Sequence, residues 1–487
     1  MTRILSVFNL LKRVGFAFLF VPLFSFAQLV PVWQRTIGGA DNDYPARAVE
    51  LENGGILIGG TVSYSDLTSD FEFTVLSSNG DSIYSFVYDQ TLPSYARDVF
   101  RRADGTCVVV GEVVTEENME TDFQIVTTTT SGHAENVSGV WHLGNDYLRD
   151  GISSADNGAF LVGKTQGGAS AIDFFVVKLD TEMWEDWSRR YANIGGSRDE
   201  ANCVYEMDMN SIYVAGSTTR LTFPSNQNMY VVKIDEDGDS LWSIEFGVDA
   251  QEEIIAIDAL NDHQLVMAAN YYFDGNGDIL VVCMDTSGEI CWQTRVGLPE
   301  IEELAIDILV ADNTIFVLGT RTNHDGIPVI LLAGMSFQGD TLWTQTISGD
   351  EGYTANSIEY MTNGDFLICG TTYRLSFPPQ EDALLFRMAQ TSHVTTDDGL
   401  VPHDIELTVF PNPFNSTLSI TLDVPLHQDV AVLLYDLLGR EVDVIYRGRL
   451  SSQMISYVAP AGMASGVYFL RASAASQSVM RKVMLLR

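Results

Sequence analysis

The chain has 487 residues, 46% of them hydrophobic, and its 65 Asp and Glu against 27 Lys and Arg give a formal net charge of −38 at pH 7. This length is too great for one ordinary domain, and the apolar content suffices for more than one core. So acidic a chain repels nucleic acid backbones and anionic lipid surfaces, which argues against both as partners. The excess charge favours solubility outside the cell, with attraction of cations as the alternative.

The first 27 residues have the pattern of a signal peptide. Arg3, Lys12 and Arg13 precede an apolar run over 14–23, and small residues at Ser25 and Ala27 fit a signal peptidase site. The run is too short to span a bilayer, and no later segment has about 20 uninterrupted apolar residues. We therefore expect export and no integral membrane segment in the mature chain.

Residues 28–390 repeat one unit of about fifty residues seven times. Each unit has four short apolar stretches separated by Gly, Asn and Asp, which predicts four antiparallel strands. The sequence therefore predicts an all-β, seven-bladed β-propeller; an open solenoid is the alternative, but it needs polar capping repeats that the sequence lacks. One small residue marks the end of the same apolar run in each unit: Gly60, Gly111, Gly163, Gly216, Ala269, Gly319 and Gly370.

An aromatic residue also recurs once per unit, opening the strand after a glycine-containing turn. These residues are Trp33, Tyr84, Trp141, Trp187, Trp242, Trp292 and Trp343. Trp33 precedes the first complete unit, and the last unit stops near Ala389 after three strands. We therefore predict that residues 33–37 supply the outermost strand of the last blade and close the ring.

Two acidic loops resemble calcium-binding loops. Asp235, Asp237 and Asp239 have suitable spacing, but the stretch DGDSLW at 237–242 recurs as NGDSIY, SGEICW and QGDTLW, which favours a hairpin turn with glycine at positive φ. The second loop contains Asp274, Asn276 and Asp278 but lacks the later glycine and the bidentate Glu. Calcium stays open at both loops, and no other cofactor is expected.

Five cysteines, an odd number in an exported chain, do not form a disulfide framework. Cys107 and Cys369 occupy equivalent places in the repeat and are expected in the core. Cys283 and Cys291 flank one hairpin turn, so a local disulfide between them is an open alternative.

The sequence contains no His-Glu-x-x-His, Gly-x-Ser-x-Gly, phosphate-loop or Cys-x-x-Cys motif, and its seven histidines are dispersed. The start of each predicted innermost strand is more informative. An aromatic column lies two or three residues ahead of a polar one. The aromatic column is Tyr44, Tyr95, Tyr147 and Tyr353, and the polar column is Arg47, Arg97, Arg149, Asn202 and Asn356.

If the first strands line the channel, these residues ring one of its mouths. They could form a funnel for sugars or carboxylates, since tyrosine offers flat faces and Arg and Asn offer directional hydrogen bonds. Alternatively, each arginine neutralises a nearby aspartate, such as Asp43, Asp98 or Asp150. The sequence leaves both explanations open.

Charge marks a domain boundary. Residues 28–403 contain 58 Asp and Glu against 17 Lys and Arg, whereas residues 404–487 contain seven of each. Residues 391–403 are polar and are predicted to be a linker. Six or seven short strand candidates in residues 404–487 predict a small immunoglobulin-like β-sandwich.

Four blocks of this tail carry a resemblance: FPNPFNSTLSITLDVP at 410–425, LLYDLLGREV at 433–442, SGVYFLR at 465–471 and RKVMLLR at 481–487. They resemble the type A C-terminal sorting domain of the bacterial type IX secretion system, and the body resembles the repeat propellers common in cargo of that system. The motif residues are Pro411, Asn412, Pro413, Gly439, Gly466, Tyr468 and Lys482. An ordinary adhesive module is the alternative for the tail.

The resemblance implies export in two steps, with the tail engaging the secretion machinery, and then release or attachment at the cell surface. Because a fold alone does not define a function, the ligand stays unidentified. We expect a secreted or cell-surface, monomeric binding module for a glycan or protein. A propeller-fold polysaccharide hydrolase or lyase and a structural envelope protein are the alternatives.

Overall fold

The computed structural model describes residues 29–486, with gaps at 40, 65–67, 89–91, 116–119, 167–171, 194–195, 221–225, 248–249, 274, 299–300, 323–325, 350–351, 375–379, 391–405, 411, 413, 437–439, 461 and 475–476. The expected signal peptide (1–27) and linker (391–403) lie outside the described residues, as do Asp274, Pro411, Pro413 and Gly439. The chain divides into two compact units, Met1–His393 and Val394–Arg487.

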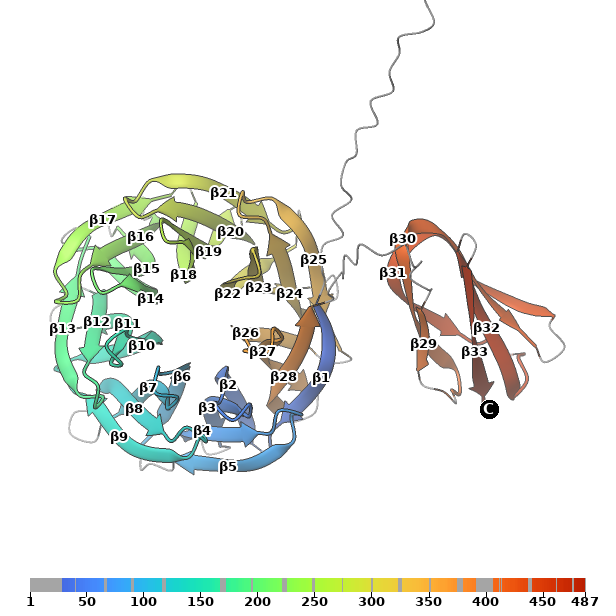
Figure 1. Cartoon of the computed structure of the whole chain (residues 1–487), viewed down its shortest axis with the longest axis horizontal. Coiled ribbons are helices and arrows are strands. Elements are labelled where there is room, and N and C mark those ends of the chain that lie inside the picture. Colours follow the sequence, from blue (N-terminus) through green and yellow to red (C-terminus); the bar gives the residue numbers. More distant parts are fainter. Residues whose placement is uncertain are drawn as a thin grey trace, which may run out of the picture. The chain divides into compact units, whose positions relative to one another are not determined.

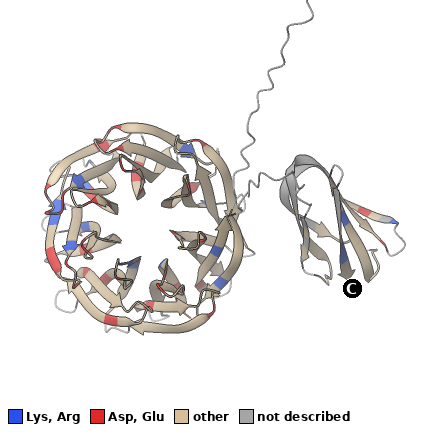
Figure 2. Ribbon diagram, viewed as in Figure 1, with Lys and Arg blue, Asp and Glu red and all other residues tan. Residues whose placement is uncertain are grey.

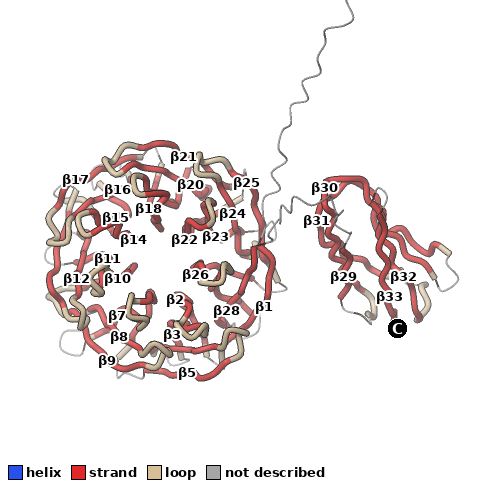
Figure 3. Tube along the Cα trace, in the orientation of Figure 1, coloured by secondary structure: helices blue, strands red, loops and turns tan. Residues whose placement is uncertain are grey.

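In the first unit, seven four-stranded antiparallel sheets surround a central channel (Figure 1), and the described residues outside the strands are turns and loops (Figure 3). The predicted seven-bladed propeller is therefore confirmed. From innermost to outermost strand, the first blade consists of β2 (Asn42–Glu50), β3 (Ile56–Ser63), β4 (Ser69–Leu76) and β5 (Ser82–Tyr88), and the second of β6 (Ser94–Arg101), β7 (Cys107–Val114), β8 (Thr121–Thr128) and β9 (Ala134–Val140). The third blade consists of β10 (Asn145–Ser153), β11 (Ala159–Gln166), β12 (Asp173–Leu179) and β13 (Glu185–Tyr191), and the fourth of β14 (Arg198–Asp208), β15 (Ser211–Thr219), β16 (Gln227–Ile234) and β17 (Ser240–Phe246). The other three are β18 (Gln251–Asn261), β19 (Gln264–Phe273), β20 (Asn276–Asp285) and β21 (Ile290–Val296); β22 (Glu303–Ala311), β23 (Thr314–Thr322), β24 (Pro328–Met335) and β25 (Thr341–Ile347); and β26 (Gly352–Tyr360), β27 (Phe366–Arg374), β28 (Gln380–Gln390) and β1 (Leu29–Ile37).

Strand β1 closes the ring as the outermost strand of the last blade. It pairs antiparallel with β28, with Gln34 opposite Phe386 and Thr36 opposite Leu384. The prediction for residues 33–37 is confirmed, and the strand begins earlier, at Leu29, which is 1% exposed. Pairing of the two ends of the propeller sequence satisfies the backbone of a strand that would otherwise be a free sheet edge.

The repeat glycine permits a β-bulge in the innermost strand. In the second, third and fourth blades, a Cβ on Gly111, Gly163 or Gly216 would clash with a carbonyl oxygen of the innermost strand. The register of the innermost strand shifts by one residue beside this glycine, between Ala96 and Asp98 in the second blade. The extra residue of such a bulge is left out of the pairing and is re-aimed.

The hairpin between the third and fourth strands also requires glycine. Gly238 has φ +79°, its N–H donates to Asp235 O (3.0 Å), and Asp239 N donates to Asp235 Oδ1 (2.8 Å). The Trp187 ring of the preceding blade lies where a Cβ on Gly238 would sit, and Trp187 Nε1 donates to Glu236 O (3.0 Å). The recurring DG stretch is thus a turn that receives the tryptophan of the neighbouring blade.

Trp141 does not belong to the aromatic column. It follows β9 and is 56% exposed, and Asn136 takes the equivalent place opposite Thr127. The interval of about fifty residues between units could not reveal this difference, because Trp141 lies only five residues after Asn136.

Asp and Glu residues are spread over the blades of the propeller (Figure 2), and some of them have a structural role. Near the start of five innermost strands a carboxylate side chain is almost completely buried: Asp43, Asp146, Asp199, Glu252 and Glu303. Three of them accept a backbone N–H from the preceding loop, as Asp199 does from Asn193 (3.0 Å). Asp43, Asp199 and Glu303 thus hold loops that connect one blade to the next.

The cysteines are free thiols, so the local disulfide considered for Cys283 and Cys291 is absent. Cys283 is buried and lies opposite Trp292 in the β20–β21 pair, whereas Cys291 is exposed. Cys107 and Cys369 lie in the core, as expected.

The second unit is a small sandwich-like region of five strands. Its sequence predicts six or seven short strands, but β30 and β31 are long, and β30 covers two of the expected segments, STLSITLDV and DVAVLLYDL. The pairing of β30 with β31 changes register between Asp423 and Gln428 and then continues. The strands are β29 (Glu406–Phe410), β30 (Thr417–Tyr435), β31 (Glu441–Val458), β32 (Gly466–Ala474) and β33 (Gln477–Leu485).

Candidate ligand-binding site

The innermost strands of all seven blades line a channel cavity of about 780 Å³. The bulge sets which side chains are equivalent around it. The bulge position holds Ala46, Arg97, Arg149, Asn202, Ile255, Ile306 and Asn356, and the next position holds Arg47, Asp98, Asp150, Cys203, Ala256, Asp307 and Ser357. Arg47 therefore occupies the same position as Asp98, Asp150 and Asp307, called the aspartate column. The prediction that Arg47 is equivalent to Arg97 and Arg149 is wrong.

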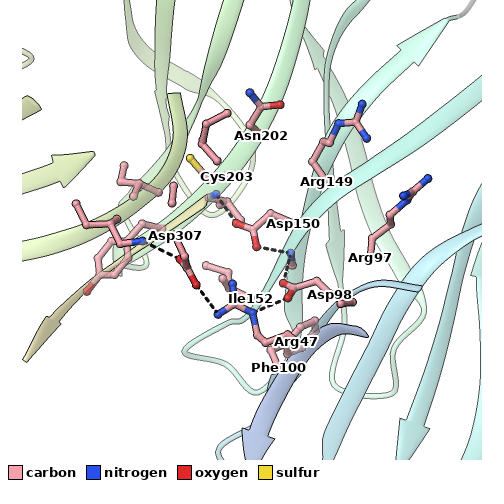
Figure 4. A pocket seen from close by; sticks show the side chains of 18 of the residues that line it. Arg47, Arg97, Asp98, Phe100, Arg149, Asp150, Ile152, Asn202, Cys203 and Asp307 are labelled. Atoms are coloured by element: carbon pink, nitrogen blue, oxygen red, sulfur yellow. Dashed lines mark hydrogen bonds and ion pairs between the residues drawn. The ribbon is translucent and has the colours of Figure 1, made fainter. Parts of the chain in front are cut away.

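Arg47 is held by ion pairs at the channel wall (Figure 4). Its Nε lies 2.7 Å from Asp98 Oδ1, and its NH1 lies 3.3 Å from Asp307 Oδ2. Burial alone would lower the pKa of Arg47, but the charges of Asp98 and Asp307 outweigh burial and raise it. Arg47 thus fits the explanation in which arginine neutralises aspartate.

The same aspartates connect neighbouring blades. Each accepts a hydrogen bond from a backbone N–H of the next innermost strand: Asp98 from Gly151 (3.1 Å), Asp150 from Val204 (2.8 Å) and Asp307 from Ile358 (3.0 Å). Asp258 reaches Val310 in the same manner at 2.7 Å. Burial raises the pKa of Asp258 to about 6 and of Glu359 to about 7.

A second cavity, of about 480 Å³, shares Arg97 and Arg149 with the channel cavity and is called the mouth cavity here. Its charged and aromatic lining residues are Tyr95, Arg97, Glu112, Tyr147, Arg149, Lys164 and Arg198. Arg97 and Arg149 project away from the ion pairs of Arg47 (Figure 4). The structure thus brings together four of the predicted site residues.

The charges in the mouth cavity are only partly paired. Arg97 NH2 lies 2.8 Å from Glu112 Oε2, and Lys164 Nζ lies 2.9 Å from Glu200 Oε2. Arg97 and Lys164 also lie over the rings of Tyr95 and Tyr147, at 5.7 and 5.5 Å from the centroids.

Arg149 and Arg198 are exposed. Within the described parts of the chain, no carboxylate lies within ion-pair distance of either of them.

Sequence reasoning missed Lys164 and Arg198. Lys164 directly follows the repeat glycine Gly163, where four other blades have Thr or Ser, and Glu112 is the other charged residue at that position. The sequence therefore contained a signal for this site: in two adjacent blades a charged residue replaces the Thr or Ser that follows the repeat glycine. Arg198 precedes the buried Asp199 and carries no such mark.

The other predicted residues lie elsewhere. Asn202 and Asn356 line the channel cavity, and each side chain donates to a carbonyl of the next blade, Ile254 O (2.8 Å) and Pro45 O (2.9 Å). Tyr44 lies at a small pocket with Ile37 and Ala383. Burial, with Glu381 nearby, raises the Tyr44 pKa to about 12.

Tyr353 is outside the tyrosine column. Thr354 takes the equivalent place opposite Thr371, and the Tyr353 hydroxyl accepts a hydrogen bond from Gln34 Nε2 (3.1 Å) in β1. Tyr353 therefore contributes to the closed last blade.

The two calcium-like loops show turn geometry where they are described. Asp235 caps its own hairpin, and Asn276 Nδ2 donates to Asp278 Oδ1 (3.2 Å). Among the described residues, no group of three or more His, Cys, Asp and Glu side chains is arranged to hold a metal ion.

One group of side chains has the residue types of a hydrolytic triad. Ser188 Oγ lies 3.3 Å from His142 Nε2, and Asp146 Oδ2 lies 3.5 Å from His142 Nδ1. However, Glu185 Oε1 also lies 3.3 Å from Nε2. The interaction with Asp146, aided by Glu185, raises the His142 pKa. Glu185 also competes with Ser188 for His142 Nε2, the nitrogen that would take the proton of the serine in a triad.

In the tail, distant motif residues meet. Asn412 Nδ2 donates to Lys482 O (2.8 Å), Met484 N donates to Asn412 Oδ1 (2.9 Å), and Phe414 N donates to Met484 O (2.8 Å). Gly466 lies opposite Leu485, and Tyr468, 9% exposed, donates its hydroxyl to Ala464 O (2.7 Å). The first and last blocks of the resemblance therefore form one local structure.

Comparisons with known proteins concern the tail and the fold. The model of a family described as "Secretion system C-terminal sorting domain" matches residues 408–486. No curated protein sequence matches the chain. In the described residues, no helix has the length and apolar character needed to cross a membrane.

Solved structures are similar at low identity. The β-propeller domain of the trilobed protease from Pyrococcus furiosus is 8% identical, with a TM-score of 0.45 over 74% of this chain and 100% of its own. The polysaccharide lyase Uly1 is 9% identical, with a TM-score of 0.45 over 73% and 91%. The acylaminoacyl peptidase from Pyrococcus horikoshii is 10% identical, with a TM-score of 0.42 over 79% of this chain, which spans 58% of that enzyme's length.

The tail blocks, their contacts and the family match agree. Residues 408–486 are a type IX secretion C-terminal sorting domain, carried by a chain whose body is a seven-bladed β-propeller.

Proposed function

We propose that this protein is delivered outside the cell by type IX secretion and acts there as a binding module, with its ligand in the mouth cavity. The sorting domain supports export. The ligand site rests on one observation: Arg149 lines the mouth cavity together with Tyr147, and no carboxylate of the described residues lies within ion-pair distance of Arg149. An exposed cation next to an aromatic ring is equipped to bind a ligand.

The contrast with Arg47 supports this assignment. Arg47 has two carboxylate partners and its side chain is 25% exposed. A structural arginine needs such partners, because an unpaired buried charge is costly. Arg149 occupies the bulge position, one residue before the position that Arg47 holds in its own blade. It is exposed and has no such partner among the described residues, so neutralisation of a nearby aspartate does not explain it.

The test is a binding screen of the mature chain, residues 28–487, against immobilised neutral oligosaccharides, acidic oligosaccharides and peptides. The Arg97→Gln/Arg149→Gln variant is compared with Arg189→Gln/Arg190→Gln, which removes the same charge from two exposed residues of β13. A ligand that the first variant loses and the second keeps supports the proposal. A ligand that both variants retain places binding elsewhere and contradicts it.

Catalysis is the second candidate. Glu359 lines the channel cavity, and burial raises its pKa to about 7, a value suited to a general acid. Release of reducing or unsaturated ends from a polysaccharide, lost in Glu359→Gln, would favour a hydrolase or lyase. Binding without turnover favours the first proposal, and neither activity favours a structural envelope role.

A further inference from the structure

The mouth cavity collects positive charge in an acidic body. Four of the 17 Lys and Arg side chains of residues 28–403 line it, against 58 Asp and Glu in the same range. They come from three consecutive blades, with Arg97 on β6, Arg149 on β10, Lys164 on β11 and Arg198 on β14. Ion pairs with Glu112 and Glu200 neutralise Arg97 and Lys164. Arg149 and Arg198 leave a local positive charge, which selects an anionic ligand.

The cavity is restricted to one side of the channel. At the bulge position the first, fifth and sixth blades have Ala46, Ile255 and Ile306, which carry no charge. At the tyrosine position the fourth and fifth blades have Glu200 and Glu253. A role in joining blades would recur around the ring, whereas cations and tyrosines concentrated beside β6 and β10 suit a ligand.

A buried acceptor in the cavity lacks a partner. Glu112 is 3% exposed, its Oε2 binds Arg97, and its Oε1 has no hydrogen-bond partner among the described residues. Buried polar atoms are normally satisfied, so an unpaired oxygen in a cavity wall indicates a donor from the ligand or solvent. A ligand with both anionic groups and hydroxyl donors would match Arg149 and Glu112 together.

Resting on the function proposed above, we infer that the ligand is an anionic polysaccharide whose carboxylate or sulfate groups bind Arg149 and Arg198. Its hydroxyl groups donate to Glu112 Oε1, and its sugar rings pack against Tyr95 and Tyr147. An acidic peptide would supply the charge. It would lack the hydroxyl-rich rings that flat tyrosine faces and a lone buried acceptor accommodate.

The test measures affinities of the mature chain, residues 28–487, by calorimetry at low ionic strength. The probes are a galacturonate hexamer, a sulfated galactose hexamer, a neutral galactose hexamer and hexaglutamate. We expect one or both anionic sugars to bind at least about tenfold more tightly than the neutral sugar. Added salt should weaken this binding. Comparison of the galacturonate hexamer with the sulfated galactose hexamer shows whether the site prefers carboxylate or sulfate groups.

Three variants locate the site. Arg149→Gln/Arg198→Gln should weaken anionic sugar binding at least about tenfold, and Tyr147→Ala should weaken it without changing the salt dependence. Arg189→Gln/Arg190→Gln, at two exposed residues of β13, should leave anionic sugar binding within about twofold of the unmodified protein, because it removes equal charge outside the cavity. Thermal unfolding of each variant confirms that it is folded.

Three outcomes would overturn the inference. Equal binding of the neutral hexamer, lost in Arg97→Gln/Arg149→Gln, would refute the anionic class while leaving the proposed function intact. Hexaglutamate binding as tight as that of both anionic sugars would identify a peptide ligand. Anionic sugar binding that is unchanged in Arg149→Gln/Arg198→Gln, or the absence of binding to any probe by the folded protein, would show that the mouth cavity is not the ligand site.

Discussion

Arg47 and Asp98 join the first two blades at the channel wall, with Arg47 Nε 2.7 Å from Asp98 Oδ1. Asp98 also accepts the Gly151 N–H, so one carboxylate links three consecutive innermost strands. This ion pair distinguishes Arg47, which has a structural role, from Arg149, for which we propose ligand binding, because the bulge places Arg47 at the position of the aspartates and Arg149 at the bulge itself.

Arg47→Gln should destabilise the propeller, since it leaves Asp98 and Asp307 without their cation. Breaking a buried ion pair is costly, and partial exposure of Arg47 reduces the effect to about 2–3 kcal/mol in the free energy of unfolding. Arg149→Gln should change it by less than about 0.5 kcal/mol. Chemical denaturation of both variants checks this, and equal losses of stability would contradict the distinction.

The buried acids should make the propeller more stable in mild acid than in mild base. Glu359 and Asp258 have pKa values raised to about 7 and about 6. Acids raised in this way stabilise the fold fully below their unfolded pKa of about 4, and the contribution disappears as pH rises through 6–7.

Glu359→Gln isolates this effect, since Gln never ionises. The variant should have a melting temperature similar to that of the unmodified protein at pH 5 and a higher one at pH 8. Melting curves across pH 4–9 measure the difference. A variant that is less stable at pH 8 would show that ionised Glu359, near Arg47, stabilises the fold.

Removal of residues 28–40 should open the ring, because β1 is the outermost strand of the last blade. The loss exposes the edge of β28 and unpairs a nine-residue strand. We expect the melting temperature to fall by roughly 5–10 °C and aggregation to increase. An unchanged melting temperature would refute the closure.

The hairpin glycines offer a matched pair of variants. A Cβ on Gly339 would lie 2.7 Å from Trp292, whereas a Cβ on Gly288 would lie 3.6 Å from Trp242, and both glycines have positive φ. Each alanine should cost about 1–2 kcal/mol of backbone strain, and Gly339→Ala about 1–2 kcal/mol more because the ring must move. Equal costs in chemical denaturation would mean that the tryptophans do not press on these turns.

The repeat made the propeller predictable, because seven copies of one strand pattern report the same structure independently. The position of the bulge was not predictable from spacing. Every innermost strand has it two residues after the tyrosine position, but the predicted columns allowed two or three residues, so Arg47, one residue past its bulge, looked equivalent to Arg97. Tyr353 was misaligned because it lies three residues before its bulge residue, Asn356, whereas Tyr95 lies two residues before Arg97. Lys164 and Arg198 reach the mouth cavity only through packing of three blades, which no single repeat reveals.

The most direct test of the mouth cavity is a crystal structure of the mature protein, residues 28–487, soaked with the anionic hexamer that binds best. We expect a carboxylate or sulfate oxygen within hydrogen-bond distance of Arg149 and a sugar ring against Tyr147. An ordered sugar bound elsewhere, with the mouth cavity holding only water, would contradict the assignment.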